Sequence, residues 1–159
     1  IREIALAKLE FSHKSRLVLL DKGVVGPFRI RDLQPLAVRY QGKILDRNGI
    51  IELDEETRTR ITSTRVPITE YGVTIITDPS VAYYSMRLAN ERAQTVSMAI
   101  TLREKLERPL NIADPYCGVG PAILQLLRVP DLVGNFLATD LNPAAVELLD
   151  ENLAASGAG

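Results

Sequence analysis

The feature that most constrains the fold is an alternation of strand and helix patterns over residues 110–153. The apolar run Leu110 to Asp114 is followed by a glycine-rich turn and a helical pattern over residues 122–128. A second apolar run, residues 133–139, ends at Asp140 and leads into a helical pattern over residues 144–153. Two strands joined through a helix pair in parallel, because a parallel pair needs a long crossover connection. We therefore predict an α/β fold with a parallel sheet in this part of the chain.

The turn from Asp114 to Pro121 is the candidate ligand-binding loop. Open α/β sheets bind ligands at the carboxyl ends of their strands, where this loop begins. Gly118 and Gly120 let the backbone approach a bound molecule, and Pro121 suits the first turn of the following helix. The two glycines alone are equally compatible with a tight strand-to-helix turn that binds nothing.

The residues around this loop favour a nucleoside ligand over a dinucleotide. Ile123 stands where the dinucleotide fingerprint has its third small residue, which disfavours pyrophosphate binding and an NAD or nucleotide-sugar enzyme. Asp140, 22 residues after Gly118, can accept hydrogen bonds from both ribose hydroxyls. Leu141 can cover one face of an adenine. A nucleoside with a short zwitterionic chain remains compatible with the loop.

Residues 1–68 predict a small β-rich domain. Residues 1–10 have a helical pattern, and short apolar runs separated by Gly, Pro and Asp follow from Leu17 onward. Asn48-Gly49 lies between two apolar runs and predicts a tight hairpin over residues 43–53. A helical turn is expected at residues 54–60.

Residues 69–159 are predicted to form the N-terminal half of the cofactor-binding domain. Residues 72–77 are expected to form a hairpin arm. From Leu88 to Leu106 the apolar residues recur at helical spacing until Pro109, which predicts one long helix.

Charge is distributed unevenly along the chain. Residues 1–70 contain 13 Lys and Arg against 10 acids, and residues 71–159 contain 6 against 10. A nucleic-acid partner would therefore bind a local patch in the first half, where basic residues cluster at Lys14/Arg16, Arg29/Arg31 and Arg58/Arg60/Arg65. An ordinary solvated surface is the alternative.

The composition also argues against several classes of protein. The chain has one cysteine and one histidine, so we expect no structural zinc site and no internal disulfide. Its apolar runs are all shorter than a membrane span, and no charged-then-apolar leader opens it, so we expect a soluble, cytoplasmic protein.

Three segments resemble a known family. Asp-Pro-Tyr-Cys-Gly-Val-Gly-Pro at residues 114–121 and Ala-Thr-Asp-Leu-Asn-Pro at residues 138–143 are similar to motif I and the next motif of the archaeal and eukaryotic tRNA guanine-N1 methyltransferases, which modify the nucleotide beside the anticodon. The wybutosine aminocarboxypropyl transferases share this core. Residues 78–92 resemble the family's segment with an aromatic-Ser pair followed by Arg-Leu and Glu-Arg. The resemblance covers about residues 70–155.

The resemblance implies a fold, a reaction and a set of site residues. It implies the N-terminal part of a Rossmann-like class I methyltransferase sheet, S-adenosylmethionine as cofactor, and methyl transfer to a guanine of tRNA, with a ring nitrogen favoured. Arg87 is the implied catalytic residue, acting on the reacting guanine, and Ser85 and Arg92 approach the methionine end of the cofactor. The predicted cofactor contacts are Ser85, Arg92, Asp114, Tyr116, Cys117, Gly118, Gly120, Asp140 and Leu141. Both arginines are alternatively compatible with a solvated helix face.

Several alternatives to this reaction stay open. The loop has Tyr-Cys where the family usually has Phe-Ala, Met86 replaces a common Pro or Gly, and the segment Asn90 to Arg92 also resembles the tRNA guanine-N2 dimethyltransferases. Aminocarboxypropyl transfer, N2 dimethylation and a non-catalytic RNA-binding homologue are therefore alternatives. The family's Asn-Pro-Pro-type motif and the general base are expected beyond Gly159, and we expect this piece of chain to be inactive alone.

Overall fold

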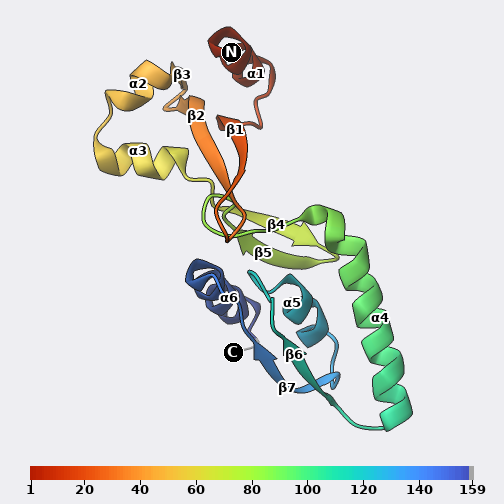
Figure 1. The fold of residues 1–159 in the computed structure, drawn as a ribbon. Helices are drawn as coiled ribbons and strands as arrows, with labels where there is room; N and C mark the ends of the chain where they lie inside the picture. Colours follow the sequence, from red (N-terminus) through yellow and green to blue (C-terminus); the bar gives the residue numbers. More distant parts are fainter. Residues whose placement is uncertain (158–159) are drawn as a thin grey trace. The chain divides into compact units, whose positions relative to one another are not determined.

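The computed structural model describes residues 1–157, which form two compact units. One unit comprises Ile1–Val25 and Arg31–Thr64, and the other comprises Gly26–Ile30 and the chain from Arg65 onward. Figure 1 shows the helices and strands of both units. Each unit has its own buried apolar clusters.

The first unit is a three-stranded sheet with helices on both faces. Its elements are α1 (Arg2–Phe11), β1 (Leu17–Val25), β2 (Ile30–Tyr40), β3 (Lys43–Asp46), α2 (Arg47–Ile51) and α3 (Glu55–Thr62), with strand order β1-β2-β3. Ala37 and Val38 on β2 are consecutive and so point to opposite faces of the sheet. Ala37 packs with Leu9 of α1, and Val38 packs with Ile50 and Ile61 of the other two helices. The helix predicted at residues 1–10 and the helical turn predicted at residues 54–60 are both confirmed.

The hairpin predicted at Asn48-Gly49 is wrong, because a helix begins there. The Oδ1 atom of Asp46 accepts a hydrogen bond from the backbone N–H of Gly49 at 3.0 Å and caps α2. An N-cap aspartate satisfies an N–H that the first turn of a helix leaves unpaired. The cap lies three residues before the glycine, and Ile50 is then buried against β2.

In the second unit, the chain from Arg65 onward begins with the hairpin of β4 (Val66–Glu70) and β5 (Val73–Thr77). Its strands are antiparallel, and the two turn residues, Tyr71 and Gly72, have φ values of 48° and 79°. Such positive values at both central positions match the right-handed twist of a hairpin. The hairpin arm predicted at residues 72–77 is therefore confirmed.

The rest of the second unit contains the predicted parallel pair. Its elements are η1 (Met86–Leu88), α4 (Ala89–Leu106), β6 (Leu110–Asp114), α5 (Pro121–Leu127), β7 (Val133–Ala138) and α6 (Pro143–Ser156). β6 and β7 are parallel, with Ile112 opposite Phe136 and Asp114 opposite Ala138. The carboxyl ends of both strands therefore meet at one edge, where the candidate loop begins. The long helix predicted before Pro109 is confirmed as α4.

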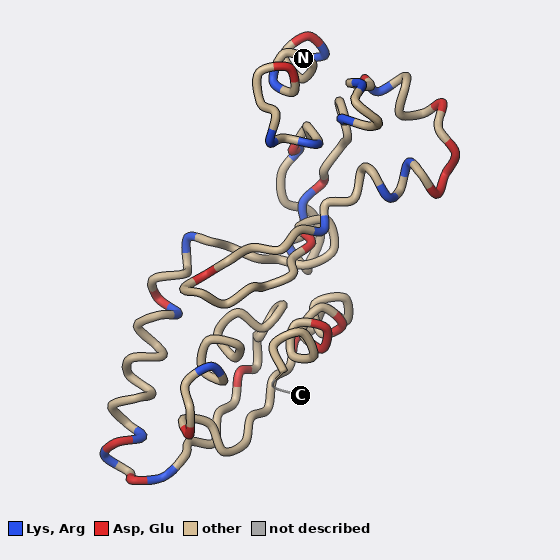
Figure 2. The backbone as a smooth tube through the Cα atoms, turned by 180° about the vertical axis from the view of Figure 1, so that it is seen from behind, with Lys and Arg blue, Asp and Glu red and all other residues tan. Residues whose placement is uncertain are grey.

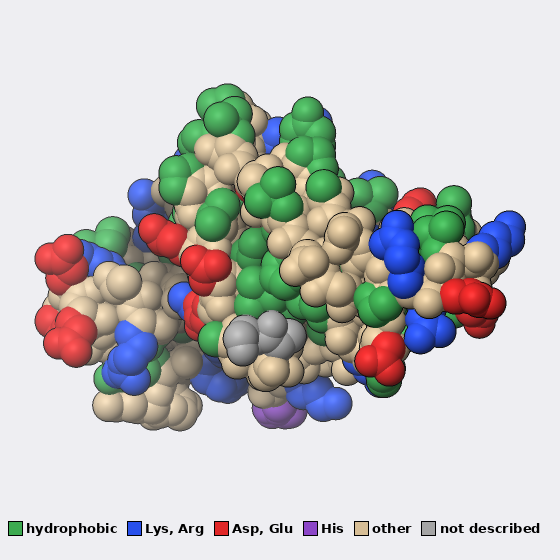
Figure 3. Space-filling model, turned by 90° about the horizontal axis from the view of Figure 1, so that it is seen from below, with side chains coloured by type: hydrophobic (Ala, Val, Ile, Leu, Met, Phe, Trp, Pro, Cys, Tyr) green, Lys and Arg blue, Asp and Glu red, His purple; other side chains and the backbone are tan. Residues whose placement is uncertain are grey.

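The core of the second unit lies around α5. One cluster joins β5, α5 and α6 through Ile75, Leu124 and Leu148, and another joins α5 to the base of the parallel pair through Leu110, Leu126 and Leu132. In contrast, α4 has no fully buried residue among those described, and Met98 on it is 73% exposed. The face drawn in Figure 3 likewise carries groups of hydrophobic side chains at its surface.

Candidate active site

The candidate loop is fastened to the carboxyl ends of both parallel strands. The N–H of Cys117 donates to the carbonyl oxygen of Thr139 at 3.0 Å, and the N–H of Thr139 donates to the carbonyl oxygen of Asp114 at 2.9 Å. The carboxylate of Asp114 also accepts a hydrogen bond from the N–H of Tyr116 at 3.1 Å. These bonds extend the β6–β7 pairing into the loop and fix its path.

Two positions in the loop favour glycine. Gly118 has φ 53° and Gly120 has φ 84°, a region that side chains with a Cβ rarely adopt. A Cβ on Gly120 would also lie 2.3 Å from Cδ1 of Leu149, whereas a Cβ on Gly118 would meet only the carbonyl oxygen of Tyr83, at 3.6 Å. The shape of the turn therefore favours glycine at both positions, and a side chain at Gly120 would in addition displace the end of Leu149 on α6.

Asp140 connects this loop to the end of β7. Its Oδ2 atom accepts a hydrogen bond from the N–H of Gly118 at 2.9 Å, and its Oδ1 atom accepts one from the N–H of Asn142 at 2.9 Å. Each carboxylate oxygen has a second lone pair, and the residue is partly exposed. Next to it Leu141 is 81% exposed, and Tyr116 on the loop is 87% exposed. A carboxylate beside accessible apolar surface suits the ribose and base of a nucleoside.

Asn142 is a site residue that the sequence interpretation missed. Its Oδ1 atom accepts a hydrogen bond from the N–H of Ala144 at 3.1 Å and caps α6. Its Nδ2 atom donates to the carbonyl oxygen of Val81 at 2.7 Å, which holds the segment of residues 78–85 beside the loop. An Asn before the N1 proline of a helix is a recognisable cap. Its bond to a residue 61 positions earlier has no counterpart in the sequence pattern.

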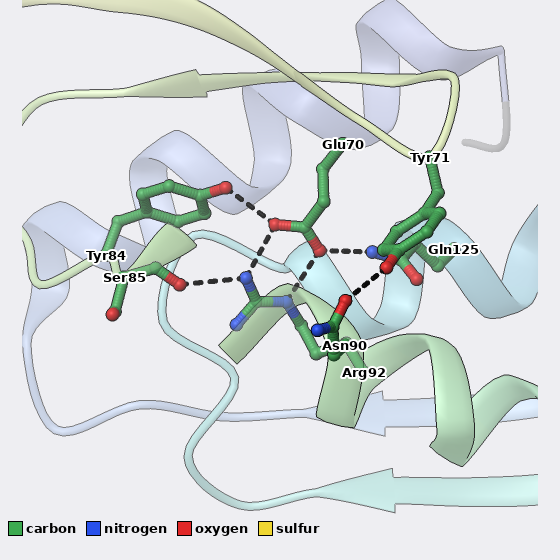
Figure 4. A network of polar contacts seen from close by, with 7 residues as sticks. All are labelled: Glu70, Tyr71, Tyr84, Ser85, Asn90, Arg92 and Gln125. Carbon is green, nitrogen blue, oxygen red and sulfur yellow. Dashed lines mark hydrogen bonds and ion pairs between the residues drawn. The ribbon is translucent and has the colours of Figure 1, made fainter. Parts of the chain in front are cut away.

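A buried polar network lies at the other end of this segment (Figure 4). Glu70, at the end of β4, is 6% exposed. The Nε and Nη2 atoms of Arg92 donate to its two carboxylate oxygens at 2.7 and 2.6 Å, the hydroxyl of Tyr84 donates to it at 2.6 Å, and Gln125 also donates to it. The Nη2 atom of Arg92 in addition donates to the carbonyl oxygen of Ser85 at 2.9 Å.

The protonation states in this network follow from its geometry. Burial by itself raises the pKa of Glu70, but the hydrogen bonds from Arg92 and Tyr84 outweigh burial and hold that pKa below its usual value. Burial, together with the bond to the Glu70 carboxylate, raises the pKa of Tyr84 to about 12. At neutral pH Glu70 is therefore an anion, and Tyr84 is a neutral hydrogen-bond donor.

The structure separates the two arginines of the sequence prediction. Arg92 lies in the network with Ser85, whereas Arg87 is exposed on η1. Two of the three guanidinium nitrogens of Arg92 are used by Glu70 and Ser85. Glu70 was not predicted as a site residue, because a single acid at the end of a hairpin strand resembles any solvated carboxylate.

The side chain of Cys117 in the loop is buried, and this burial determines the protonation state of its thiol. Burial, together with the nearby Asp114 and Asp140 carboxylates, raises the pKa of its thiol to about 11. The thiol is therefore protonated at neutral pH. The residues described, 1–157, contain no group of three His, Cys, Asp or Glu side chains placed to hold a metal ion.

We predict that Cys117 reacts slowly with alkylating reagents in the folded protein. A pKa of about 11 against an ordinary value of 9.0 lowers the thiolate fraction at pH 8 by about 100-fold. Iodoacetamide labelling of the peptide containing Cys117, followed by mass spectrometry, should be at least about 100-fold slower than in the denatured protein. Labelling at equal rates in the two states would contradict the buried, protonated thiol.

One cavity in the second unit is distinct from this site. It has a volume of about 400 Å³ and lies among β5, α5 and α6. Its lining contains none of the predicted cofactor contacts; the lining residues are Gly72, Val73, Thr74, Ile76, Leu124, Leu127, Arg128, Ala155 and Ser156. The candidate site is an open edge of the sheet instead.

Several of the basic residues predicted as an RNA surface have partners within their own units. Arg16 donates to the carbonyl oxygen of Ile61 at 3.0 Å, and Arg31 pairs with Asp21 at 2.8 Å. Arg65 pairs with Glu151. Figure 2 shows Lys and Arg interspersed with acidic residues along the chain. No helix among the residues described is long and apolar enough to cross a bilayer.

The sequence is similar to two curated tRNA methyltransferases. It is 38% identical over 89 residues to tRNA (guanine(37)-N(1))-methyltransferase 2 of Phaeodactylum tricornutum, a match that covers 56% of this chain and 14% of that protein. It is 33% identical over 84 residues to tRNA (guanine(37)-N(1))-methyltransferase Trm5b of Pyrococcus abyssi, covering 53% of this chain and 22% of that protein. No protein-family model matches the chain.

Solved structures share the fold over nearly the whole chain. The structure of aTrm5 with tRNALeu has a TM-score of 0.67 at 24% identity and covers 98% of this chain and 37% of that one. The Methanocaldococcus jannaschii Trm5 structure in complex with adenosine has a TM-score of 0.62 at 23% identity, with 99% and 37% covered. The predicted α/β fold and the resemblance to tRNA guanine-N1 methyltransferases are thus confirmed, and the chain spans less than a quarter of the length of either curated relative.

Proposed function

We propose that the protein transfers a methyl group from S-adenosylmethionine to a ring nitrogen of a guanine in tRNA. The observation that carries this proposal is the sequence similarity to two proteins named as tRNA (guanine(37)-N(1))-methyltransferases. The site geometry supports it, because the glycine loop and Asp140 meet at the carboxyl edge of a parallel pair. Since this chain spans only 14% and 22% of those relatives, the activity is proposed for the full-length protein.

The residues at the loop fit the cofactor. Asp140 has carboxylate lone pairs available for two ribose hydroxyls, and exposed Leu141 and Tyr116 offer apolar surface to an adenine. Gly118 and Gly120 keep the backbone accessible. When bound, S-adenosylmethionine would supply a methyl group on a positively charged sulfur. A guanine ring nitrogen would attack the methyl carbon, the neutral thioether would leave, and the proton of the ring nitrogen would pass to a base.

The residues of this chain mainly position the two reactants. Residues 78–88 lie beside the loop through the Asn142–Val81 bond and carry both Ser85 and Arg87. We assign Arg87 to the carbonyl oxygen of the reacting guanine, where a guanidinium stabilises developing negative charge. Holding both reactants in register contributes much of the rate of such a displacement.

The proposal extends to the organisation of the protein. We assign residues 69–159 to the N-terminal half of a Rossmann-like class I methyltransferase sheet, and residues 1–68 to a preceding small domain that contributes to tRNA binding. The excess of Lys and Arg in residues 1–70 supports the second assignment. We also propose a cytoplasmic location, one compartment in which tRNA is present. The names of the relatives favour N1 methylation over aminocarboxypropyl transfer, N2 dimethylation or a non-catalytic role.

Replacing Asp140 tests the cofactor assignment. We expect Asp140→Ala to weaken S-adenosylmethionine binding to the full-length protein by about 1–3 kcal/mol, because ribose hydroxyls lose their acceptor. Isothermal titration calorimetry measures this directly. The matched control is Asp150→Ala, at an exposed carboxylate on α6, which should leave the affinity unchanged. Wild-type affinity in Asp140→Ala would remove Asp140 from the site.

A further inference from the structure

The Glu70 network joins four parts of the second unit that are far apart in sequence. Glu70 ends β4, Tyr84 lies in the segment beside the loop, Arg92 is on α4, and Gln125 is on α5, the helix that follows the glycine loop. The side-chain exposure of the Arg92–Glu70 ion pair is 12% and 4%. Figure 4 shows the side chains of Tyr84, Arg92 and Gln125 converging on the carboxylate of Glu70.

A buried ion pair of this kind is weak evidence for stability. The cost of removing two charges from water often exceeds their attraction, and apolar residues of the same volume often serve stability equally well. What a bidentate arginine–carboxylate pair provides is geometry, since the planar guanidinium is held in one orientation.

The fixed guanidinium holds the start of η1. Arg92 Nη2 donates to the carbonyl oxygen of Ser85 at 2.9 Å, and the N–H of Leu88 donates to the same oxygen at 3.3 Å. Ser85 is the N-cap residue of η1, and Arg87 lies in the middle of that single turn. The direction of the Arg87 side chain therefore depends on the position of the Ser85 carbonyl.

We propose that Glu70 is a positioning residue for methyl transfer: it orients Arg92, which holds the Ser85 carbonyl and so sets the placement of Arg87 over the site. The inference rests on the proposed function, in which Arg87 acts on the guanine. Gln125 on α5 also donates to the Glu70 carboxylate. The position of Glu70 therefore affects both the turn that carries Arg87 and the helix that follows the glycine loop.

The test is a double-mutant cycle in the full-length protein. The variants are Glu70→Gln, Arg87→Ala and the double variant, with Glu147→Gln at an exposed position of α6 as the matched control. Each is assayed by single-turnover methyl transfer to an unmodified tRNA transcript at saturating cofactor. Cofactor affinity is measured by calorimetry, and amide hydrogen exchange is followed in the peptide containing residues 83–90.

A positioning role predicts a specific pattern. Glu70→Gln should lower the single-turnover rate about 10- to 100-fold with cofactor affinity within about threefold of wild type, as for a misplaced catalytic group. The double variant should be no more than about threefold slower than Arg87→Ala alone, because both substitutions disrupt the same function, the action of Arg87 on the guanine. Exchange in residues 83–90 should be faster in Glu70→Gln and unchanged in Glu147→Gln.

Three results would overturn the proposal, and they distinguish the role of Glu70 from the proposed function. Rate losses that multiply in the double variant, or a Glu70→Gln protein that is less stable but transfers methyl at the wild-type rate when folded, would leave Glu70 with a purely structural role. A wild-type protein that transfers no methyl group would overturn the proposed function itself, and with it the role of Glu70.

Discussion

Replacing Gly120 with alanine is expected to destabilise the second unit and to abolish measurable cofactor binding in the full-length protein. The φ of 84° costs an alanine about 1–2 kcal/mol. The new Cβ would also lie 2.3 Å from Cδ1 of Leu149, so the end of that side chain, which is 3% exposed, would have to shift. Overpacking of this kind costs about 1–3 kcal/mol. Denaturant unfolding and calorimetric titration with S-adenosylmethionine measure the two effects.

The chain provides a matched control for this change. Gly157 has a similar φ of 71°, but a Cβ there would meet nothing within 4 Å. Gly157→Ala should therefore cost only the backbone term of about 1–2 kcal/mol and leave cofactor affinity unchanged. Gly120→Ala should also be less harmful in a Leu149→Ala background, where the clash is absent. Equal effects of the two glycine substitutions on cofactor binding would contradict the packing argument.

The second large effect is expected at Arg87. Arg87→Ala should lower kcat by about 100-fold, the loss typical of a donor that stabilises charge in the transition state. Cofactor affinity should stay at the wild-type value, because Arg87 is exposed on η1 and separate from the loop bonds around Asp140. Steady-state methylation of an unmodified tRNA transcript, run beside cofactor titration, separates kcat from binding.

Lys105, an exposed cation near the end of α4, the helix that follows η1, supplies the control for Arg87. Lys105→Ala removes one positive charge without touching η1 and should leave kcat within about twofold of wild type, as expected for a surface substitution. If Arg87→Ala behaved in the same way, Arg87 would be a solvated surface residue and the catalytic assignment would fail.

The elements that could be predicted from the sequence are those fixed by local pattern. The β6–α5–β7–α6 order, the long helix α4 and the first helix all follow from apolar periodicity with proline and glycine at the boundaries. The glycine loop could be located because strand, turn and helix are contiguous there. The same kind of local pattern gave the wrong hairpin prediction at Asn48-Gly49, because an Asp-Arg-Asn-Gly stretch can form either a helix cap or a hairpin turn. Burial of Ile50 in the folded unit favours the helix.

The parts that could not be predicted depend on contacts between distant residues. Glu70 contacts Arg92 and Gln125 only when the hairpin packs beside α4 and α5. The sequence around a glutamate does not indicate whether its carboxylate will be buried. Arg92 is predicted to contact the cofactor, and in the structure its immediate partners are Glu70 and Ser85. Asn142 could be recognised as a cap, but its bond to Val81 depends on the fold.

The most direct test of the central claim is identification of the nucleoside that the full-length protein makes. An unmodified tRNA transcript is incubated with the protein and S-adenosylmethionine, digested to nucleosides and analysed by mass spectrometry against standards. We predict 1-methylguanosine from a single guanine, and its loss in Asp140→Ala at low cofactor concentration. Methylation at the exocyclic N2, transfer of an aminocarboxypropyl group, or no modified nucleoside at all would contradict the proposed function.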